Sequence, residues 1–277
     1  MPLLSQHQSN EFTKMIVLGD PGTGKTGGLA SLVKAGYKLA ILDYDNGLDI
    51  LRLFIEHECP DKIDNVIFKS LRDKYKMINT QLIVDGPPKA FTDGLKLLDE
   101  WPDYGKPSEW GPEWVLVVDS LTHCGRASFD WAKVAMPKNP DPRAAYFFAQ
   151  TGIEAMLADL TSEYFRTNVI VITHVNYVDT EDGKRKGYPN AIGSALSPKI
   201  GSWFNSMALC TMKGKERVIQ TAPTGQIDLK NPAPFAMLPE YPISTGLAEF
   251  FKVLKKPETN KPTPIKPTAV RPTIVRR

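Results

Sequence analysis

The stretch that decides the fold is residues 15–26, MIVLGDPGTGKT. Its first four residues form a short apolar run of the length of a buried strand. Three glycines, Gly19, Gly22 and Gly24, follow closely, and Lys25–Ala35 is predicted to be a helix. Glycines permit backbone conformations that other residues avoid, so successive N–H groups can turn inward. The order strand, glycine-rich turn and helix therefore predicts a phosphate-binding loop.

We expect this loop to bind ATP and Mg²⁺. Its backbone amides and the positive end of the following helix favour phosphate oxygens. Lys25 is expected to reach the β- and γ-phosphates, and the Thr26 hydroxyl to coordinate Mg²⁺. The residues predicted to contact the nucleotide are Gly19, Asp20, Pro21, Gly22, Thr23, Gly24, Lys25, Thr26 and Gly27.

A second ligand for the metal is predicted at Asp119. The apolar run WVLVV at 114–118 leads directly into this aspartate. Mg²⁺ in phosphate-transferring proteins is held by one or two carboxylates together with phosphate oxygens. We expect Asp119 to lie beside Thr26 and hold the metal; in the alternative, it only caps the helix that follows.

The rest of the chain alternates short apolar runs with longer amphipathic segments. This pattern predicts an α/β fold, a mostly parallel twisted sheet flanked by helices. The predicted strands are Met15–Leu18, Leu39–Leu42, Val66–Ser70, Val115–Asp119 and Val169–Thr173, and the predicted helices are Lys25–Ala35, Ala90–Glu100 and Ala144–Tyr164. Residues 101–113 are expected to be a surface loop, and residues 210–238 to be strands and turns with a hairpin at Thr224-Gly225.

Composition and charge divide the chain into three parts: an N-terminal extension at 1–13, an ATPase domain at 14–254, and a basic tail at 255–277. The tail holds seven Lys or Arg and one acid, so the body is mildly acidic although the whole chain carries +3. The tail repeats a cation followed by proline every five residues, which favours disorder. It is either a solubilising spacer or a clamp for nucleic acid.

Targeting signals are not visible in the sequence. No apolar run approaches the roughly 20 residues needed to cross a bilayer, so no membrane association is expected. The three cysteines are far apart and are interpreted as buried small residues of a reducing compartment. We therefore expect a cytoplasmic protein, in the host cytoplasm if a bacteriophage encodes it.

Two further segments narrow the class of ATPase. Residues 41–49, ILDYDNGLD, end one strand in an acidic cluster, and His174 follows the strand Val169–Thr173. Together with VVDS at 117–120, this order resembles the ATPase core of the RecA-like recombinases, over roughly residues 14–236. The length of the core is similar to that of the bacteriophage RecA-like single-strand annealing proteins.

The resemblance implies roles for individual residues. Asp45 matches the carboxylate that activates water, with Asp43 and Asp49 as rivals. His174 matches the position that senses the γ-phosphate. Lys230 matches a lysine that touches ATP across a subunit boundary; the rival cations are Lys213, Lys215 and Arg217.

The resemblance also implies two loops that bind single-stranded DNA. The first lies within Gly125–Arg143, and its predicted contacts are Arg126, Lys133, Lys138 and Arg143. The second is Asn176–Ala191, with contacts at Lys184, Arg185, Lys186 and Tyr188. Cations with aromatics between them suit phosphates and stacked bases. In the alternative, both segments are solvated surface loops.

Taken together, these patterns predict an ATP-hydrolysing, DNA-stimulated recombination protein that anneals single strands. The expected partners are single-stranded DNA, further copies of the chain in a ring or short filament with Mg-ATP between subunits, and a single-strand DNA-binding protein. The rivals are a helicase-like motor or loader, a small-molecule P-loop kinase, and a nucleotide-binding scaffold without turnover.

Overall fold

The computed structural model describes residues 11–136 and 141–255. The tail from residue 256 onward, Lys138 and residues 1–10 of the predicted extension lie outside the described residues.

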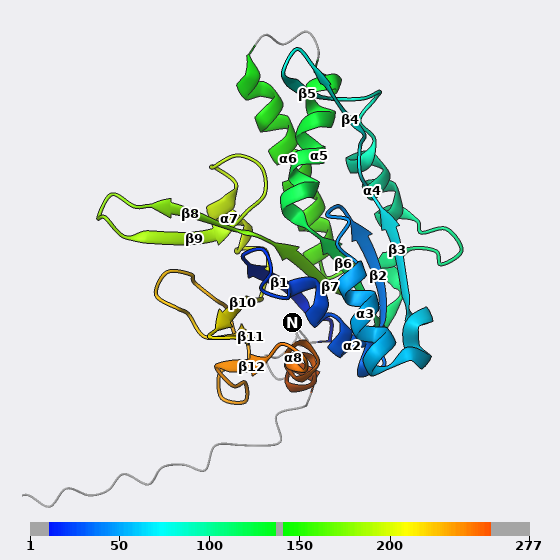
Figure 1. Cartoon of the computed structure of the whole chain (residues 1–277), viewed down its shortest axis with the longest axis vertical. Coiled ribbons are helices and arrows are strands. Elements are labelled where there is room, and N and C mark those ends of the chain that lie inside the picture. The colour runs from blue at the N-terminus through cyan, green and yellow to red at the C-terminus, as the bar shows by residue number, and fades with distance from the viewer. Residues whose placement is uncertain (1–10, 137–140, 256–277) are drawn as a thin grey trace, which may run out of the picture.

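The centre of the molecule is an eight-stranded sheet in the order β12-β11-β10-β1-β7-β6-β2-β3 (Figure 1). The six strands from β10 to β3 are parallel, and β11 and β12 extend the β10 edge in antiparallel pairing. Their bounds are β1 Lys14–Gly19, β2 Lys38–Asp43, β3 Val66–Ser70, β6 Gly111–Asp119, β7 Thr167–Thr173, β10 Ser206–Lys213, β11 Glu216–Gln220 and β12 Glu240–Pro242. The prediction of a mostly parallel sheet is confirmed.

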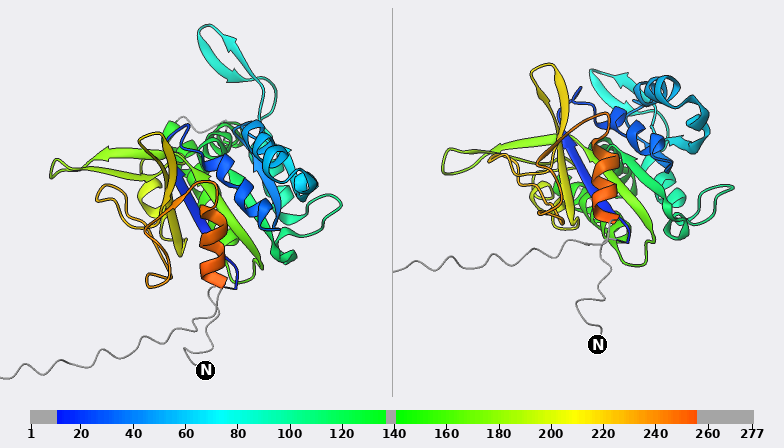
Figure 2. Two further views of the ribbon diagram at one scale, coloured as in Figure 1. Left: turned by 60° about the horizontal axis from the view of Figure 1, so that its bottom comes forward. Right: turned by 90° about the horizontal axis from the view of Figure 1, so that it is seen from below.

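Helices cover both faces of the sheet, as the two views of Figure 2 show. They are α1 Lys25–Gly28, α2 Ala30–Lys34, α3 Asp49–Glu58, α4 Ala90–Asp99, α5 Leu121–Ala135, α6 Pro142–Thr161, α7 Ser197–Ile200 and α8 Gly246–Lys255, with 3₁₀ turns η2 Pro60–Asn65 and η3 Pro107–Glu109. None of the described helices is long and apolar enough to cross a membrane.

Alternate residues of each central strand supply two separate cores. In β1, Ile16 and Leu18 join a cluster with α4, α5, α6 and α7. Met15 and Val17 point to the opposite face and join a cluster with α2, α3 and α8. Side chains alternate across a strand, so a run that is apolar at every position is buried on both faces. This is why β1, β2, β6 and β7 could be predicted from short apolar runs, whereas β10, which pairs with β1, was not among the predicted strands.

Two two-stranded hairpins project from the sheet. One is formed by β4 Tyr75–Ile78 and β5 Gln81–Val84, and the other by β8 Val175–Asp179 and β9 Arg185–Pro189. The first follows β3 and the second follows β7, so both leave the edge where the parallel strands end. This is the edge that carries the predicted phosphate loop after β1.

Several local predictions were wrong. The hairpin between β10 and β11 turns at Gly214-Lys215, whereas Thr224-Gly225 lies in the loop after β11. Residues 101–113 form turns and are mostly exposed, as predicted, but they also include the 3₁₀ turn η3, the start of β6 and the buried Trp101, which packs edge-on against Trp110. The β4–β5 hairpin and α3 were not predicted.

Candidate functional site

The glycine-rich loop joins β1 to α1 in the conformation that its sequence predicts. Gly22 and Gly24 have φ angles of 81° and 92°, in the left-handed region that favours glycine. A Cβ atom at Gly24 would lie 2.8 Å from Cδ of Arg217, and one at Gly19 would lie 2.6 Å from the carbonyl oxygen of Cys210. The loop therefore needs glycine both for its backbone angles and for the close approach of its neighbours.

Lys25 lies in the curve of this loop. Its ammonium donates hydrogen bonds to the backbone oxygens of Gly19 at 2.8 Å and Asp20 at 2.9 Å. The side chain is buried, and burial is the main cause that lowers its pKa; nearby Asp119 and Asp45 act in the opposite direction. A buried cation beside inward-facing backbone amides is a chemical match for phosphate oxygens.

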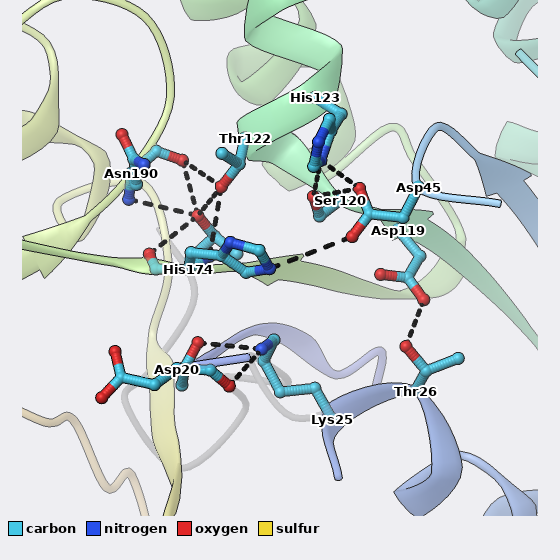
Figure 3. A network of polar contacts seen from close by, with 12 residues as sticks. Asp20, Lys25, Thr26, Asp45, Asp119, Ser120, Thr122, His123, His174 and Asn190 are labelled. Carbon is cyan, nitrogen blue, oxygen red and sulfur yellow. Dashed lines mark hydrogen bonds and ion pairs between the residues drawn. The ribbon is translucent and has the colours of Figure 1, made fainter. Parts of the chain in front are cut away.

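Thr26 and Asp119 meet as predicted. The Thr26 hydroxyl donates to Oδ2 of Asp119 over 2.7 Å, although 93 residues separate them (Figure 3). Asp119 is 1% exposed, and burial raises its pKa to about 7. A hydroxyl and a carboxylate oxygen at this distance, next to a phosphate cradle, fit the oxygen ligands that Mg²⁺ prefers.

Asp45 is the acid of the 41–49 cluster that faces the site. Oδ1 accepts a hydrogen bond from the Ser120 hydroxyl at 2.7 Å and contacts Nδ1 of His123, while Oδ2 lies 3.9 Å from Nε2 of His174 (Figure 3). Burial acts to raise the pKa of Asp45, but the bonds from His123 and Ser120 and the two imidazoles together hold it below its usual value. The carboxylate is thus kept ionised, as a proton acceptor must be.

The rival carboxylates face elsewhere. Asp43 is buried, accepts hydrogen bonds from the backbone N–H of Asn46 and the hydroxyl of Ser70, and so closes the turn after β2. Asp49 is exposed in the first turn of α3, near Arg52. Among the three candidates for the carboxylate that activates water, the geometry favours Asp45.

His174 stands between β7 and β8, at the root of the second hairpin. Its backbone N–H donates to the Thr122 hydroxyl, which in turn donates to the carbonyl of Asn190. The Thr173 hydroxyl donates to the same carbonyl at 2.6 Å and accepts from the Asn190 N–H. Burial, followed by the charge of Lys25, lowers the pKa of the His174 imidazole. Both ends of the β8–β9 hairpin are therefore bonded to the strand end that carries His174.

A cleft of about 610 Å³ runs over the loop. Its polar lining includes Lys25, Thr26, Asp45, Asp119 and His174. Ile50, Phe54 and Ile243 add an apolar part to the lining.

The four cations considered for contact with a nucleotide across subunits differ in position. The Lys230 ammonium donates to the carbonyl oxygens of Gly201 and Phe204 just after α7, and is held within its own chain. Lys213 pairs with Glu240, and Lys215 lies in the β10–β11 turn. Arg217 lines the cleft and donates from Nε to the Gly22 carbonyl at 2.9 Å. Of the four, Arg217 is the one beside the phosphate loop.

The prediction of a first DNA-binding loop within Gly125–Arg143 is wrong for most of its described residues, because α5 continues to Ala135. Arg126 and Lys133 lie on this helix and pair with Asp130 at 2.9 and 2.7 Å. The Asp130 side chain is fully buried, and its single negative charge is shared between the two cations. Arg143 is exposed at the start of α6, beside Asp141.

The second predicted loop is the β8–β9 hairpin. Lys184 pairs with Asp182 and Lys186 with Asp228, while the Arg185 guanidinium lies 4.8 Å from the centre of the Tyr177 ring. Tyr188 is half-buried on β9. Exposed ion pairs contribute little free energy, so these cations remain free to exchange their partners for phosphates.

A family described as an AAA domain matches residues 11–233, which is more than half of the chain. The chain belongs to this family. The AAA domain match spans the phosphate loop, the Thr26–Asp119 pair and the β8–β9 hairpin, and identifies the chain as a P-loop ATPase domain. No curated protein matches the sequence significantly.

Solved structures that resemble this AAA domain chain include three ATPases. A prototypical ATPase of the type III secretion system of pathogenic bacteria has 14% identity and a TM-score of 0.41, covering 72% of this chain and 52% of its own. The ATPase EscN of enteropathogenic E. coli, in complex with its central stalk EscO, has 13% identity and a TM-score of 0.42, and the match covers 73% of this chain and 42% of EscN. The ATP synthase subunit NeqB of Nanoarcheaum equitans has 12% identity and a TM-score of 0.39, and the match covers 73% of this chain and 48% of NeqB. The chain thus spans about half the length of these proteins.

Sequence reasoning missed His123, Thr122 and Asn190. His123 lies in the first turn of α5, which begins two residues after Asp119 ends β6, so both lie near the same strand end. Asn190 contributes through its backbone, for which side-chain identity gives no signal.

Proposed function

We propose that this protein hydrolyses ATP with Mg²⁺ and couples the nucleotide state to the binding and annealing of single-stranded DNA, as the resemblance to the bacteriophage RecA-like annealing proteins implies. One observation carries the coupling: His174, which faces Asp45, is the residue immediately before β8, and Asn190, immediately after β9, is bonded to Thr173 and Thr122. A change at the γ-phosphate is thereby transmitted directly to the root of a cation-bearing hairpin.

The proposed chemistry assigns one task to each residue. The loop amides and Lys25 would hold the β- and γ-phosphates, and Thr26 and Asp119 would hold Mg²⁺, whose positive charge would stabilise the transferred phosphoryl group. Asp45 accepts a proton from the attacking water, while Ser120 and His123 orient its carboxylate. His174 reports the presence of the γ-phosphate to β8.

Contacts with further copies of the chain are part of the proposal. Arg217 replaces Lys230 as the candidate cation that acts on phosphates, because it lines the cleft whereas Lys230 is bonded to carbonyl groups of its own chain. Arg217 acts within its own subunit in this arrangement. The subunit boundary would lie over the exposed side of the cleft, and a ring or short filament would place DNA-binding hairpins side by side.

The experiment that tests this function measures ATP turnover by the full chain with and without a single-stranded oligonucleotide at low salt. We expect stimulation by the oligonucleotide and faster annealing of complementary strands in the presence of Mg-ATP. The variant Lys25→Ala is the control and should lose nucleotide binding and both activities. Turnover that does not respond to DNA would reject the recombination function while leaving the ATPase; directional unwinding of a duplex would favour the motor instead.

A further inference from the structure

The β4–β5 hairpin is an unexplained feature of the fold. It stands away from the body of the molecule (Figure 2, left). Both of its strands carry exposed apolar side chains. Met77 is 65% exposed and Leu82 55% exposed, and Ile78 and Ile83 are exposed as well. An isolated two-stranded hairpin is only marginally stable in water, so these apolar side chains need a functional reason.

The apolar side chains lie on both faces of the ribbon. Met77 pairs with Leu82 on one face, whereas Ile83 pairs with Lys76 and Ile78 pairs with Gln81 on the other. A protein partner normally covers one continuous apolar face with a polar rim. A thin ribbon that is apolar on both sides is instead suited to insertion between flat groups, as apolar wedges insert between bases.

The charge around the hairpin favours a polyanion. Residues 66–89 hold five Lys or Arg and two Asp, in a body that is otherwise mildly acidic. Both aspartates have local partners: Asp73 accepts from the backbone N–H groups of Lys89 and Ala90, and Asp85 pairs with Lys76. Among the described residues, Lys69, Arg72 and Lys74 form no ion pair or side-chain hydrogen bond, and all three are exposed.

The root of the hairpin is firmly attached to the domain. The Tyr75 hydroxyl donates to Oδ2 of buried Asp130 on α5, the same carboxylate that binds Arg126 and Lys133. The N–H of Asp85 donates to the carbonyl of Lys74 and closes the base of the ribbon. The fold thus fixes where the hairpin starts and leaves its apolar end in solvent.

From this arrangement we propose that the β4–β5 hairpin is a further contact surface for single-stranded nucleic acid. Met77, Leu82 and their neighbours lie between bases and unstack them, while Lys69, Arg72 and Lys74 bind the flanking phosphates. This inference rests on the proposed function, in which the protein binds single strands. It adds a base-separating element that the cationic β8–β9 hairpin does not supply.

The test uses the full chain with Mg-ATP and an oligonucleotide that contains 2-aminopurine, whose fluorescence rises when its neighbours unstack. The double variant Met77→Ser/Leu82→Ser should remove this rise and weaken binding about fivefold, which is the lower end of what an aromatic side chain stacked on a base contributes. The variant Leu238→Ser is the matched control, because Leu238 is 59% exposed and lies outside the hairpin. The melting temperature should be the same for all three proteins.

A second pair of substitutions tests the phosphate contacts. Lys69→Gln/Lys74→Gln should reduce the slope of log affinity against log salt by about 0.7 per lysine. An unchanged slope together with an unchanged 2-aminopurine signal would overturn the inference and leave the proposed function standing. A change of assembly mass in Met77→Ser/Leu82→Ser with unaltered DNA binding would assign the hairpin to contacts between copies and also overturn it. Failure of the unsubstituted protein to bind the oligonucleotide would reject the proposed function itself.

Discussion

Replacing His123 by alanine is expected to slow ATP hydrolysis without weakening nucleotide binding. His123 does not line the cleft but contacts Oδ1 of Asp45, the oxygen that also accepts from Ser120. The contact also raises the pKa of the His123 imidazole, since the carboxylate favours the protonated ring. Alanine leaves Asp45 with one hydrogen bond on this oxygen and free to rotate away from the attacking water.

The magnitude follows from the exposure of the pair. A hydrogen bond to a charged group contributes about 1.5–3 kcal/mol. The His123 side chain is 52% exposed and that of Asp45 is 21% exposed, so solvent screening favours the low end of the range. A loss of about 1.5 kcal/mol from the transition state corresponds to roughly a tenfold lower kcat. The Kd for Mg-ATP should not change.

The assay compares kcat from steady-state turnover with Kd from calorimetry for alanine and asparagine variants. Asparagine carries an N–H donor at the position of Nδ1, so His123→Asn should recover most of the activity. Alanine turnover equal to that of the unsubstituted protein would refute the reasoning. Equal losses in both variants, at an unchanged melting temperature, would also refute it. If Asp45→Asn hydrolyses ATP normally, Asp45 is not the proton acceptor and His123 has nothing to orient.

Three further outcomes are expected. Thr122→Val removes the hydroxyl that links His174 to Asn190, so basal ATP turnover should be kept and its stimulation by DNA lost. Thr122→Ser, which keeps the hydroxyl, is the control. Stimulation retained in Thr122→Val would show that DNA binding at the hairpin is not coupled to the nucleotide through this bond. Deleting residues 255–277 should lower DNA affinity and flatten its salt dependence if the tail is a clamp, whereas an unchanged slope would make it a spacer. Burial lowers the pKa of Lys14 to about 7, so the unfolded chain binds more protons than the folded one between about pH 7 and 10. The free energy of unfolding, measured with urea, should therefore rise between about pH 7 and 10 more steeply than that of Lys14→Met, and this difference should disappear toward pH 7. Parallel pH profiles of the two proteins would contradict the shift.

Local patterns were sufficient for the phosphate loop and for the strands β1, β2, β6 and β7. Gly22 and Gly24 are required by the backbone itself, and runs such as Val115–Val118 are apolar at every position because both faces of the sheet are covered. Asp119 could be predicted as the end of such a run. These features depend on neighbours in the chain, which is why the sequence alone determined them.

The remaining features depend on packing between distant segments. The sequence predicted a DNA loop within Gly125–Arg143, but α5 persists to Ala135 because Ala127 and Ala132 are buried and Trp131 stacks on Phe148 of α6. The length of a helix depends mainly on the tertiary packing of its buried face, which the local sequence does not reveal.

The arrangement around Asp45 was likewise decided by the tertiary structure. Asp45, His123 and His174 follow three different strands, and their side chains meet only because parallel β2, β6 and β7 end at one edge of the sheet. The sequence named the residue types that hydrolysis requires. The order of the strands then decided that His123 contacts Asp45 and that Arg217 faces the loop. That order sets the distances between segments that lie far apart in the sequence.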